Sequence, residues 1–426
     1  MPESTPLSSV EARVAALIGA RRPGHALDRA FYTDPSIFAL DLERLLLRRW
    51  FCAGHESRIP APGDYFTVNL GRESVIVVRA ADGRVRALLN VCRHRGSRLC
   101  DHKSGHVSGG RFTCPYHAWT YDLDGRLLAA RQMAADFDAS ASGLRRLSVE
   151  IAEGLIFLCF ADSPPDFSRA RDALRRSAGV HGWGRAKVAH SETYTIRANW
   201  KLAVENYMEC YHCQPAHPEF ARRHVYSRPP DTTEALEVAA RARSLAQGIV
   251  IEDLDEYGPN LVPGGESVSI LRSALFEGMQ TASPDGAPVA PLMGDFTAHD
   301  GSSTYFDIGP VSDFLAYADH GVMYRFIPRE AELTEMEVVW LVDANAVEGR
   351  DYDVERLTWL WRATSIEDKK IIEMNAEGVA SAYFVPGPYA RQEAYAGRFV
   401  DWYLAELGAR DTPVGGSGRA WRVAGR

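Results

Sequence analysis

The sequence predicts an α+β protein: an all-β domain followed by an α+β domain that contains an antiparallel sheet and helices. Three observations predict this class. Short alternating or β-branched runs fill residues 51–161, a Pro-containing break follows at 162–166, and strand-like runs then alternate with longer helical patterns. With 426 residues, the chain is long enough for two domains with substantial cores.

The first 50 residues carry a helical pattern. Apolar residues recur at helical spacing over residues 8–20 and 36–50, and the second stretch ends in Arg48, Arg49 and Trp50. We expect residues 1–50 to form a helical segment that packs on the larger, C-terminal domain.

Residues 51–161 have the pattern of short strands. The runs 65–68, 74–78 and 148–151 alternate in polarity or are rich in β-branched residues, and Gly, Asp and Pro separate them. We expect a single all-β domain over residues 51–161.

Residues 162–426 mix both kinds of pattern. A stretch with helical spacing, 167–177, follows the break, and runs such as 192–196 and 335–340 are strand-like. We expect an α+β domain over residues 162–426.

The charge and the apolar runs exclude two classes of partner. The formal charge is −8, whereas nucleic-acid binding needs a basic surface. The longest apolar runs, such as 75–78 and 155–160, have the length of strands and are far too short to cross a bilayer. We therefore expect neither a nucleic-acid partner nor a membrane partner.

The N-terminus and the cysteines predict a cytoplasmic protein. Glu3 and Glu11 interrupt the start, and two arginines then precede Pro-Gly where a signal peptide would have an apolar stretch. Cys52, Cys159 and Cys210 lie in strand-like or motif segments rather than in a disulfide framework.

Two short cysteine–histidine pairs lie within the predicted all-β domain. Cys92 and His94 form one pair, and Cys114 and His117 form the other. Two thiolates and two imidazoles fit a Rieske [2Fe-2S] cluster, in which two histidines replace two cysteines on one iron. A structural zinc site is the alternative, but zinc fingers place Cys with Cys and His with His. The mixed pairs favour the cluster.

A second candidate site lies in the α+β domain. Glu209 and His212 are three residues apart, so we expect them to share a helix face, and His217 follows beyond Pro215, where a helix should end or kink. Two histidines and one carboxylate from elsewhere form the facial triad of non-haem Fe(II) oxygenases. Alternatively, both histidines are ordinary core or surface residues near a helix end.

These segments resemble a known family. The stretches 92–96 and 114–119, followed by 199–218, are similar to the α subunit of Rieske non-haem iron oxygenases, which hydroxylate rings or remove methyl groups, and the resemblance covers nearly the whole chain. It implies that Cys92, His94, Cys114 and His117 bind the [2Fe-2S] cluster. It also implies that His212 and His217 bind Fe(II), with a third carboxylate ligand toward the C-terminus.

The third ligand has two candidates. Asp368 is the first choice, because it lies in a helical stretch at the position where the family has its aspartate, and Glu367 is the rival. The resemblance further gives Glu209 the role of a carboxylate that links a Rieske histidine of one subunit to the iron site of the next. It therefore implies an oligomer, expected to be a homotrimer, with a hexamer left open.

The chemistry requires a partner protein. Activating O2 at one Fe(II) consumes two external electrons, and the sequence has neither a convincing nucleotide-binding glycine fingerprint nor a second set of iron–sulfur cysteines. We expect electrons to come from NAD(P)H through a separate flavin/iron–sulfur reductase. A non-catalytic electron carrier is the less favoured alternative. The ligand loops lack the extra cysteine pair of high-potential Rieske proteins, and Cys100 alone does not restore it.

Within the family, the sequence is most similar to the oxygenases of quaternary ammonium compounds, which include glycine betaine monooxygenase, choline monooxygenase and stachydrine demethylase. Such enzymes hydroxylate an N-methyl group, and formaldehyde is then released. The segments that carry this similarity are 90–100, 209–213, 346–357 and 386–389.

The substrate pocket is the least defined part of the sequence. Aromatic residues offer a cation–π cage for a trimethylammonium group, although each of them is equally a core candidate. The runner-up function is an aromatic carboxylate ring hydroxylase, with an arginine pairing the carboxylate. The cage candidates are Tyr305, Phe306, Phe314, Tyr317 and Tyr324, and the arginines are Arg222, Arg223 and Arg325.

Overall fold

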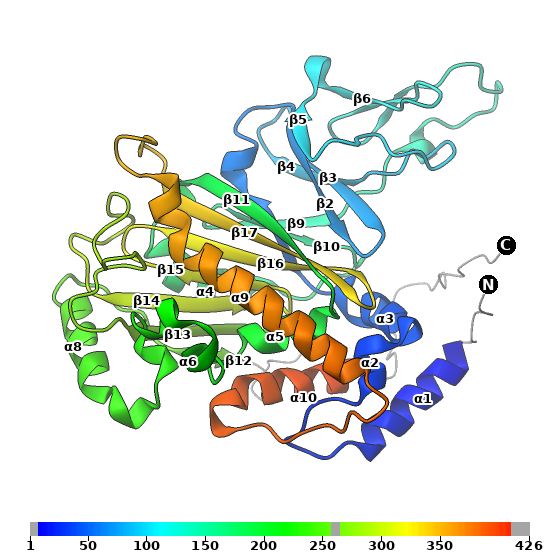
Figure 1. The fold of residues 1–426 in the computed structure, drawn as a ribbon. Coiled ribbons are helices and arrows are strands. Elements are labelled where there is room, and N and C mark those ends of the chain that lie inside the picture. The colour runs from blue at the N-terminus through cyan, green and yellow to red at the C-terminus, as the bar shows by residue number, and fades with distance from the viewer. Residues whose placement is uncertain (1–6, 257–264, 410–426) are drawn as a thin grey trace.

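A computed structural model describes residues 7–256 and 265–409 and shows a small all-β lobe beside a larger α+β body (Figure 1). The body is organised around a seven-stranded antiparallel sheet, and the lobe around a four-stranded and a three-stranded sheet. The predicted α+β class is confirmed. Parts of the predicted segments 1–50 and 162–426 lie outside the described residues.

The small lobe has its own core. Alternate residues of β3, such as Ile76 and Val78, are fully buried and pack in one core with Trp119 and Tyr121. Its four-stranded sheet has the order β4-β3-β2-β5 and its three-stranded sheet the order β6-β7-β8. The strands are β2 (Asp64–Leu70), β3 (Glu73–Arg79), β4 (Val85–Leu89), β5 (Ser104–His106), β6 (Arg111–Thr113), β7 (Thr120–Asp122) and β8 (Leu127–Ala129).

A third, three-stranded sheet joins the two ends of the lobe to the body. It has the order β1-β10-β9, and every residue of β1 and β10 is buried. Because β1 and β10, at the two ends of 51–161, pair with each other, we propose 51–161 as one unit, although this sheet also contributes to the core of the body. The strands are β1 (Phe51–His55), β9 (Ser148–Ala152) and β10 (Leu155–Cys159).

The large sheet has the order β11-β17-β16-β15-β14-β13-β12, and all neighbouring strands are antiparallel. Its central strands are almost wholly buried, because helices cover one face and the core around Trp183 covers the other. The strands are β11 (Ala186–Ile196), β12 (Leu254–Glu256), β13 (Val268–Ala274), β14 (Ser302–Ile308), β15 (Ser312–Ala316), β16 (Gly321–Glu330) and β17 (Leu333–Asp343).

One long helix, α9 (Val354–Ala380), crosses this sheet and begins at an Asp353 side-chain cap (Figure 1). Short helices from the middle of the chain pack beside it, and the N-terminal helices pack against it and against α10. The helices are α1 (Leu7–Ala20), α2 (Arg29–Thr33), α3 (Pro35–Asp41), α4 (Ser168–Leu174), α5 (Trp200–Tyr207), α6 (Cys213–Ala216), α7 (Pro218–Ala221), α8 (Glu234–Leu245) and α10 (Ala394–Gly408).

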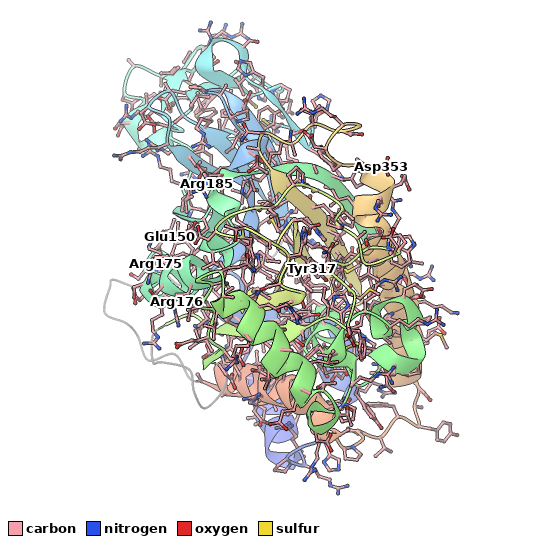
Figure 2. All side chains as sticks on the ribbon, turned by 90° about the vertical axis from the view of Figure 1, so that its left-hand side faces the viewer. Glu150, Arg175, Arg176, Arg185, Tyr317 and Asp353 are labelled. Carbon is pink, nitrogen blue, oxygen red and sulfur yellow. A yellow bond between two sulfur atoms is a disulfide. The ribbon has the colours of Figure 1, made fainter. Side chains whose placement is uncertain are left out.

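Short 3-10 and π turns connect these elements. Two of them are single π turns that extend the ends of α3 and α4, η1 (Leu42–Leu46) and η5 (Arg175–Gly179). The segment from η5 to β11 carries Arg175, Arg176 and Arg185 on the surface (Figure 2). The 3-10 turns are η2 (Glu56–Arg58), η3 (Ser108–Gly110), η4 (Ser140–Ser142), η6 (Trp183–Arg185), η7 (Val225–Ser227), η8 (Pro230–Thr232) and η10 (Arg391–Glu393).

Among residues 7–256 and 265–409, no helix is both long and apolar enough to cross a membrane. The longest, α9, spans 27 residues and is amphipathic, with buried residues recurring along one face.

A fully buried ion pair connects the N-terminal segment to the body. Asp41, at the end of α3, pairs with Lys201 of α5, and both side chains are 0 % exposed. The Tyr403 hydroxyl of α10 and the Trp200 indole also donate to Asp41, at 2.7 and 3.1 Å. Burial lowers the pKa of Lys201, and the neighbouring Asp41 carboxylate opposes that shift.

Removing the cation of this pair should destabilise the protein strongly. Lys201→Met leaves the Asp41 carboxylate buried without its counter-charge, so we expect a loss of about 3–5 kcal/mol of unfolding free energy, measured by urea denaturation. Adding Asp41→Asn to Lys201→Met should recover most of that loss. As a control, Lys369→Met removes a partly exposed partner of Glu373 and should cost no more than about 0.5 kcal/mol. Equal urea midpoints for Lys201→Met and the wild type would contradict this account.

Candidate metal centres and the adjoining cavity

The two cysteine–histidine loops of the lobe have the same backbone conformation. In each loop the cysteine carbonyl accepts a hydrogen bond from the N–H four residues later, Gly96 to Cys92 at 2.9 Å and Ala118 to Cys114 at 3.0 Å. That fourth residue has a positive φ in both loops, 78° for Gly96 and 58° for Ala118. A positive φ costs energy at alanine, so the surrounding structure holds the second loop in place.

The loops bring four candidate ligands together at the tip of the lobe. Both thiols are buried and free of disulfide bonds, whereas His94 is exposed and His117 partly exposed. The two imidazole rings lie 4.6 Å apart, and Trp119 stacks on His94 at 4.9 Å. The thiols therefore face the core of the lobe, and the imidazoles face its surface.

The environment of the thiols suits deprotonated ligands. Burial raises the pKa of Cys114, but hydrogen bonds from the backbone of Tyr116 and His117 and from the Cys92 thiol outweigh burial and lower it. The Tyr121 hydroxyl lies 3.3 Å from Cys92 Sγ. Hydrogen bonds to cluster sulfurs are one means by which a protein adjusts a cluster potential.

The pairing of the four ligands, thiol with thiol and imidazole with imidazole, favours a cluster over a single zinc ion. One tetrahedral zinc would gather all four donor atoms around one point. In the part of the chain that the structure describes, His212, His217 and Asp368 form such a compact group, with ligand atoms all within 4.8 Å of one another. The lobe instead holds a thiol pair and an imidazole pair, as a two-iron cluster with unlike ligands requires.

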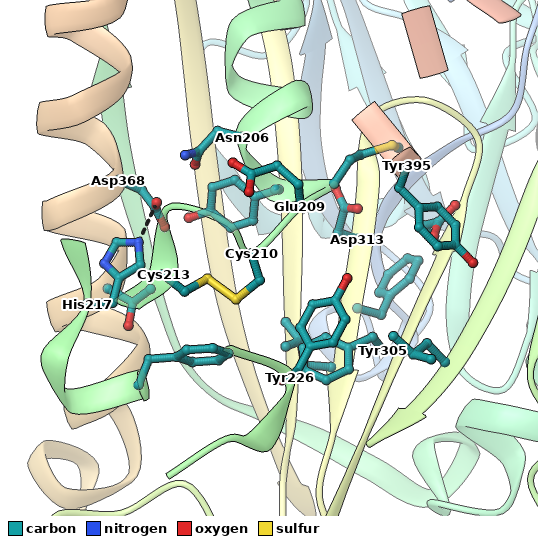
Figure 3. A pocket seen from close by; sticks show the side chains of 18 of the residues that line it. Asn206, Glu209, Cys210, Cys213, His217, Tyr226, Tyr305, Asp313, Asp368 and Tyr395 are labelled. Carbon is teal, nitrogen blue, oxygen red and sulfur yellow. Dashed lines mark hydrogen bonds and ion pairs between the residues drawn. A yellow bond between two sulfur atoms is a disulfide. The ribbon is translucent and has the colours of Figure 1, made fainter. Parts of the chain in front are cut away.

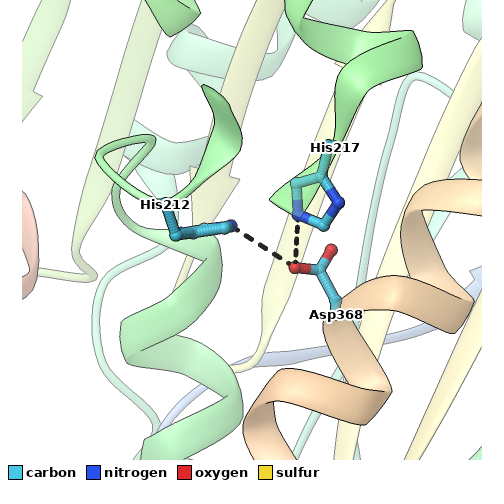
Figure 4. Close-up of side chains that lie close together, drawn as sticks. All are labelled: His212, His217 and Asp368. Carbon is cyan, nitrogen blue, oxygen red and sulfur yellow. Dashed lines mark hydrogen bonds and ion pairs between the residues drawn. The ribbon is translucent and has the colours of Figure 1, made fainter. Parts of the chain in front are cut away.

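The second centre forms where α9 passes the turn between α5 and α7 (Figure 4). Asp368 Oδ1, on α9, lies 2.9 Å from His217 Nε2 and 3.4 Å from His212 Nε2. Two imidazole nitrogens and one carboxylate oxygen thus converge on one point. This donor set is that of a 2-His-1-carboxylate iron site, so the residues present fit a mononuclear Fe(II).

A glutamate contacts the Nδ1 atom of each histidine, on the side of the ring away from Asp368. Glu209 accepts a hydrogen bond from His212 Nδ1 at 2.5 Å, and Glu367 lies 2.9 Å from His217 Nδ1. A hydrogen bond at the far ring nitrogen fixes the tautomer and the orientation of a ligating histidine. The two candidates for the carboxylate ligand therefore have different contacts. Asp368 lies next to the Nε2 atoms of both histidines, whereas Glu367 contacts only Nδ1, on the far side of the His217 ring.

The triad concentrates negative charge around the histidines. Burial lowers the pKa of His212, but hydrogen bonds to Asp368 and Glu209 outweigh burial and raise it to about 9. The pKa of His217 is raised as well, since Asp368 and Glu367 overcome the effect of burial. The charge that attracts protons to these rings also favours a divalent cation between them.

Local chain geometry explains how the two histidines meet. Asn199 caps the start of α5, which ends at Tyr207, so Glu209 and His212 lie in a turn and do not share a helix face. That part of the sequence-based expectation is wrong. His217 lies at the break between α6 and α7, because Pro218 cannot continue the backbone hydrogen bonding of α6.

A disulfide closes this turn. Cys210 and Cys213 are bonded to each other on either side of His212, so the expectation that Cys210 lies outside any disulfide is wrong. The turn brings their Cα atoms to 4.9 Å, a separation that a disulfide can span. The C-x-x-C spacing was the signal in the sequence.

A cavity of about 120 Å³ opens beside the triad (Figure 3). It is smaller than the roughly 300–1,000 Å³ of pockets for drug-sized ligands, which favours a small substrate. His212, His217 and Asp368 lie in its wall, and aromatic rings form much of the remainder. A molecule bound here lies next to the point on which the three donor atoms converge.

Three of the five aromatic cage candidates line this cavity, namely Tyr305, Phe306 and Phe314. Tyr317 and Tyr324 are not part of the lining and are fully buried. The Tyr317 hydroxyl lies 2.8 Å from His224 Nε2, deep inside the body (Figure 2), and the Tyr324 hydroxyl lies 3.0 Å from Ser365 Oγ.

Sequence reasoning missed several lining residues, because they come from distant segments. Tyr226 follows α7, Asp307 and Asp313 face each other on β14 and β15, Trp361 is on α9 and Tyr395 is on α10. No spacing rule connects these positions in the sequence.

The three arginines proposed as carboxylate partners lie elsewhere. Arg325 is buried in an ion pair with Glu337, and Arg222 is exposed. Arg223 donates to the carbonyl oxygens of Ser283 and Glu219. None of the three lines the cavity.

Two family models match the chain. The model for the ring hydroxylating alpha subunit (catalytic domain) matches residues 183–409, and the model for the Rieske [2Fe-2S] domain matches residues 49–148. The first contains the triad, and the second contains both cysteine–histidine loops.

Two relatives are similar over most of their length, and a third over about half of it. A glycine betaine monooxygenase oxygenase subunit from Chromohalobacter salexigens is 36 % identical over 406 residues, which is 93 % of this chain and 89 % of the relative. One from Pseudomonas aeruginosa is 35 % identical over 94 % of both chains. A carnitine monooxygenase oxygenase subunit from Escherichia coli is 36 % identical over 203 residues, 45 % of this chain and 52 % of the relative.

Solved structures share the fold. The quaternary ammonium Rieske monooxygenase CntA, in complex with L-carnitine, covers 96 % of this chain and 100 % of its own, with a TM-score of 0.67 at 22 % identity. Naphthalene 1,2-dioxygenase with bound indole covers 90 % of this chain and 92 % of its own, with a TM-score of 0.63 at 21 % identity.

The family models therefore cover the segments that hold the two candidate centres, and the solved structures share the fold of nearly the whole chain. The chain belongs to the family of ring-hydroxylating oxygenase α subunits, enzymes that combine a Rieske [2Fe-2S] cluster with a mononuclear iron and O2.

Proposed function

We propose that this protein is the oxygenase component of a monooxygenase that removes a methyl group from a small quaternary ammonium compound. The observation that carries this proposal is the small, aromatic-lined cavity beside the triad. Aromatic faces attract a permanent cation, and the limited volume disfavours a polycyclic ring. The names of the relatives, which are glycine betaine and carnitine monooxygenases, support the same substrate class over an aromatic acid.

The proposed ligands follow from the geometry of the two centres. We assign Cys92, His94, Cys114 and His117 to the cluster, and His212, His217 and Asp368 to the mononuclear iron. In such enzymes the bound metals activate O2 with electrons from NAD(P)H, delivered by a separate flavin/iron–sulfur reductase. We further propose a homotrimer located in the cytoplasm.

The residues of this chain then have distinct tasks. Tyr305 and its aromatic neighbours hold the ammonium group, and Glu209 and Glu367 keep the two histidines in the orientation required for ligation. The net reaction inserts one oxygen atom into an N-methyl C–H bond, and the other oxygen atom leaves as water with two electrons and two protons. The N-hydroxymethyl product then loses formaldehyde and a proton to give the tertiary amine.

Removing the proposed carboxylate ligand should empty one metal centre and leave the other intact. In Asp368→Ala we expect the iron content to fall from about three to about two per chain while the Rieske visible and EPR spectra persist, because the lobe is untouched. Glu367→Ala is the matched control next to it and should retain iron with weaker binding, by about 10- to 100-fold. A fully active Asp368→Ala beside an iron-free Glu367→Ala would move the assignment to Glu367.

Glu209 is the proposed link between a cluster in one subunit and the iron in the next. Glu209→Gln keeps a hydrogen-bond acceptor for His212 but removes the charge, so both metals should stay bound while electron transfer slows. Single-turnover reoxidation of the reduced cluster measures that step. Reoxidation at the wild-type rate would leave Glu209 with only its role in orienting His212.

The reaction class is tested with the complete system. With a compatible reductase, methylated ammonium compounds should stimulate O2 uptake and release formaldehyde in step with it, and glycine betaine, which would give dimethylglycine, is the first to assay. Benzoate and other aromatic acids serve as the contrasting set. Coupled turnover of an aromatic acid, without any response to a methylated ammonium compound, would favour the ring hydroxylase.

A further inference from the structure

Two aspartates lie side by side in the wall of the cavity. Asp307 on β14 is paired in register with Asp313 on β15, so their side chains stand on the same face of the sheet. Both line the cavity, and Figure 3 shows Asp313 there, away from His217 and Asp368. Like charges at directly opposed positions of a sheet repel, and enclosure by protein strengthens the repulsion.

Neither carboxyl group is neutralised by the protein around it. Asp307 accepts a hydrogen bond from the Ser269 hydroxyl through one oxygen, and its other oxygen is buried without a partner. Asp313 is partly buried, and among residues 7–256 and 265–409 no cation pairs with its carboxyl group. A buried carboxylate without a partner is costly, so the pair needs either protons or a cation from outside the protein.

The described wall of the cavity contains no lysine or arginine. Beyond the lining, the Arg398 guanidinium stacks over Tyr395 at 4.1 Å and is already paired with Asp255. Among the described lining residues, a substrate carboxylate would therefore meet two further carboxyl groups and no lysine or arginine. Glycine betaine and carnitine both carry such a carboxylate.

Aromatic rings complete the same part of the cavity. The ring centroids of Tyr226 and Tyr305 lie 5.3 Å apart, and Tyr395 lines the same cavity (Figure 3). Aromatic faces and carboxylates both attract cations, and neither attracts an anion. The chemistry of this region is thus suited to a net positive ligand.

Building on the demethylation proposed above, we propose that the cavity selects ammonium substrates with a net positive charge and no carboxylate, and that Asp307 and Asp313 are the residues that set this specificity. The chemical class is a methylated ammonium compound whose second functional group is neutral, such as an alcohol, an amide or an ester, or is itself cationic.

The protonation of the pair adds a pH dependence. Burial raises the pKa of Asp307 to about 7, with Asp255 adding to the shift and Ser269 opposing it, and burial also raises the pKa of Asp313 well above its usual range. A bound cation favours the ionised carboxylates, so binding releases protons and affinity should rise as pH increases through about 7. The other charged or titratable groups around the pair are Asp255 on β12, Arg398 and Tyr395 on α10, Glu209 before α6 and Tyr226.

The test compares two ligands of nearly the same shape. Glycine betaine is a zwitterion, and glycine betaine amide has the same trimethylammonium group with a neutral amide in place of the carboxylate. Binding to the iron-loaded holoenzyme under anaerobic conditions is measured by calorimetry, and kcat/KM is measured by formaldehyde release with the reductase. We expect the amide to be favoured at least about tenfold in both measurements.

Asparagine substitutions then assign this preference to the two aspartates. In Asp307→Asn/Asp313→Asn, which preserves the shape of both side chains, the amide should lose most of its advantage. Asp295→Asn removes one exposed carboxylate outside the cavity and should keep the wild-type ratio.

Two results would overturn the inference. The first is that glycine betaine binds to the wild type no worse than its amide, as it would if protonated aspartates donated hydrogen bonds to its carboxylate. The second is that the double variant keeps the wild-type ratio. Failure of the reaction class is a separate outcome. If no methylated ammonium compound releases formaldehyde, yet the amide and tetramethylammonium bind in a manner that depends on the two aspartates, the demethylation proposal fails and the charge selection stands.

Discussion

The meeting of Asp368 with His212 and His217 is the contact on which the candidate active site depends. The aspartate comes from the middle of the long helix α9, and the histidines come from a short turn more than 150 residues earlier. Helix α9 is held over the sheet by its own buried face, so Asp368 has little freedom to move. The turn must therefore place both histidines next to Asp368. Its short helices, the break at Pro218 and the disulfide all limit the conformations of its backbone.

Charge is arranged in layers around this contact. Asp368 faces the point where the donor atoms converge, and Glu209 and Glu367 lie on the opposite sides of the two rings. Such an arrangement keeps the ligands oriented even when the centre changes its charge, since the far nitrogens remain bonded. The candidate cluster ligands are also held in place, but by backbone hydrogen bonds within the two loops and by packing of the thiols in the lobe core.

The cavity shows why membership of a family does not define a substrate. The chain matches both family models, and the relatives reported above are named for zwitterionic ammonium compounds. The paired aspartates of β14 and β15, however, lie in a wall that offers no arginine or lysine among the described residues. A metal centre accepts many substrates, whereas the electrostatics of the surrounding wall selects among them.

The sequence by itself determined the chemistry that depends on local spacing. The Cys92 to His94 and Cys114 to His117 pairs, the His212 to His217 pair and the division into β and α+β regions are all readable within short windows, because loops and strands follow local patterns. Only the tertiary structure placed Asp368 rather than Glu367 beside both histidines, since one helical step of about 100° decides which carboxylate faces the turn. It alone also brought Asp307, Asp313, Tyr226 and Tyr395 into one cavity, because side chains that share a wall need only be adjacent in space, and strand register and helix packing set that adjacency.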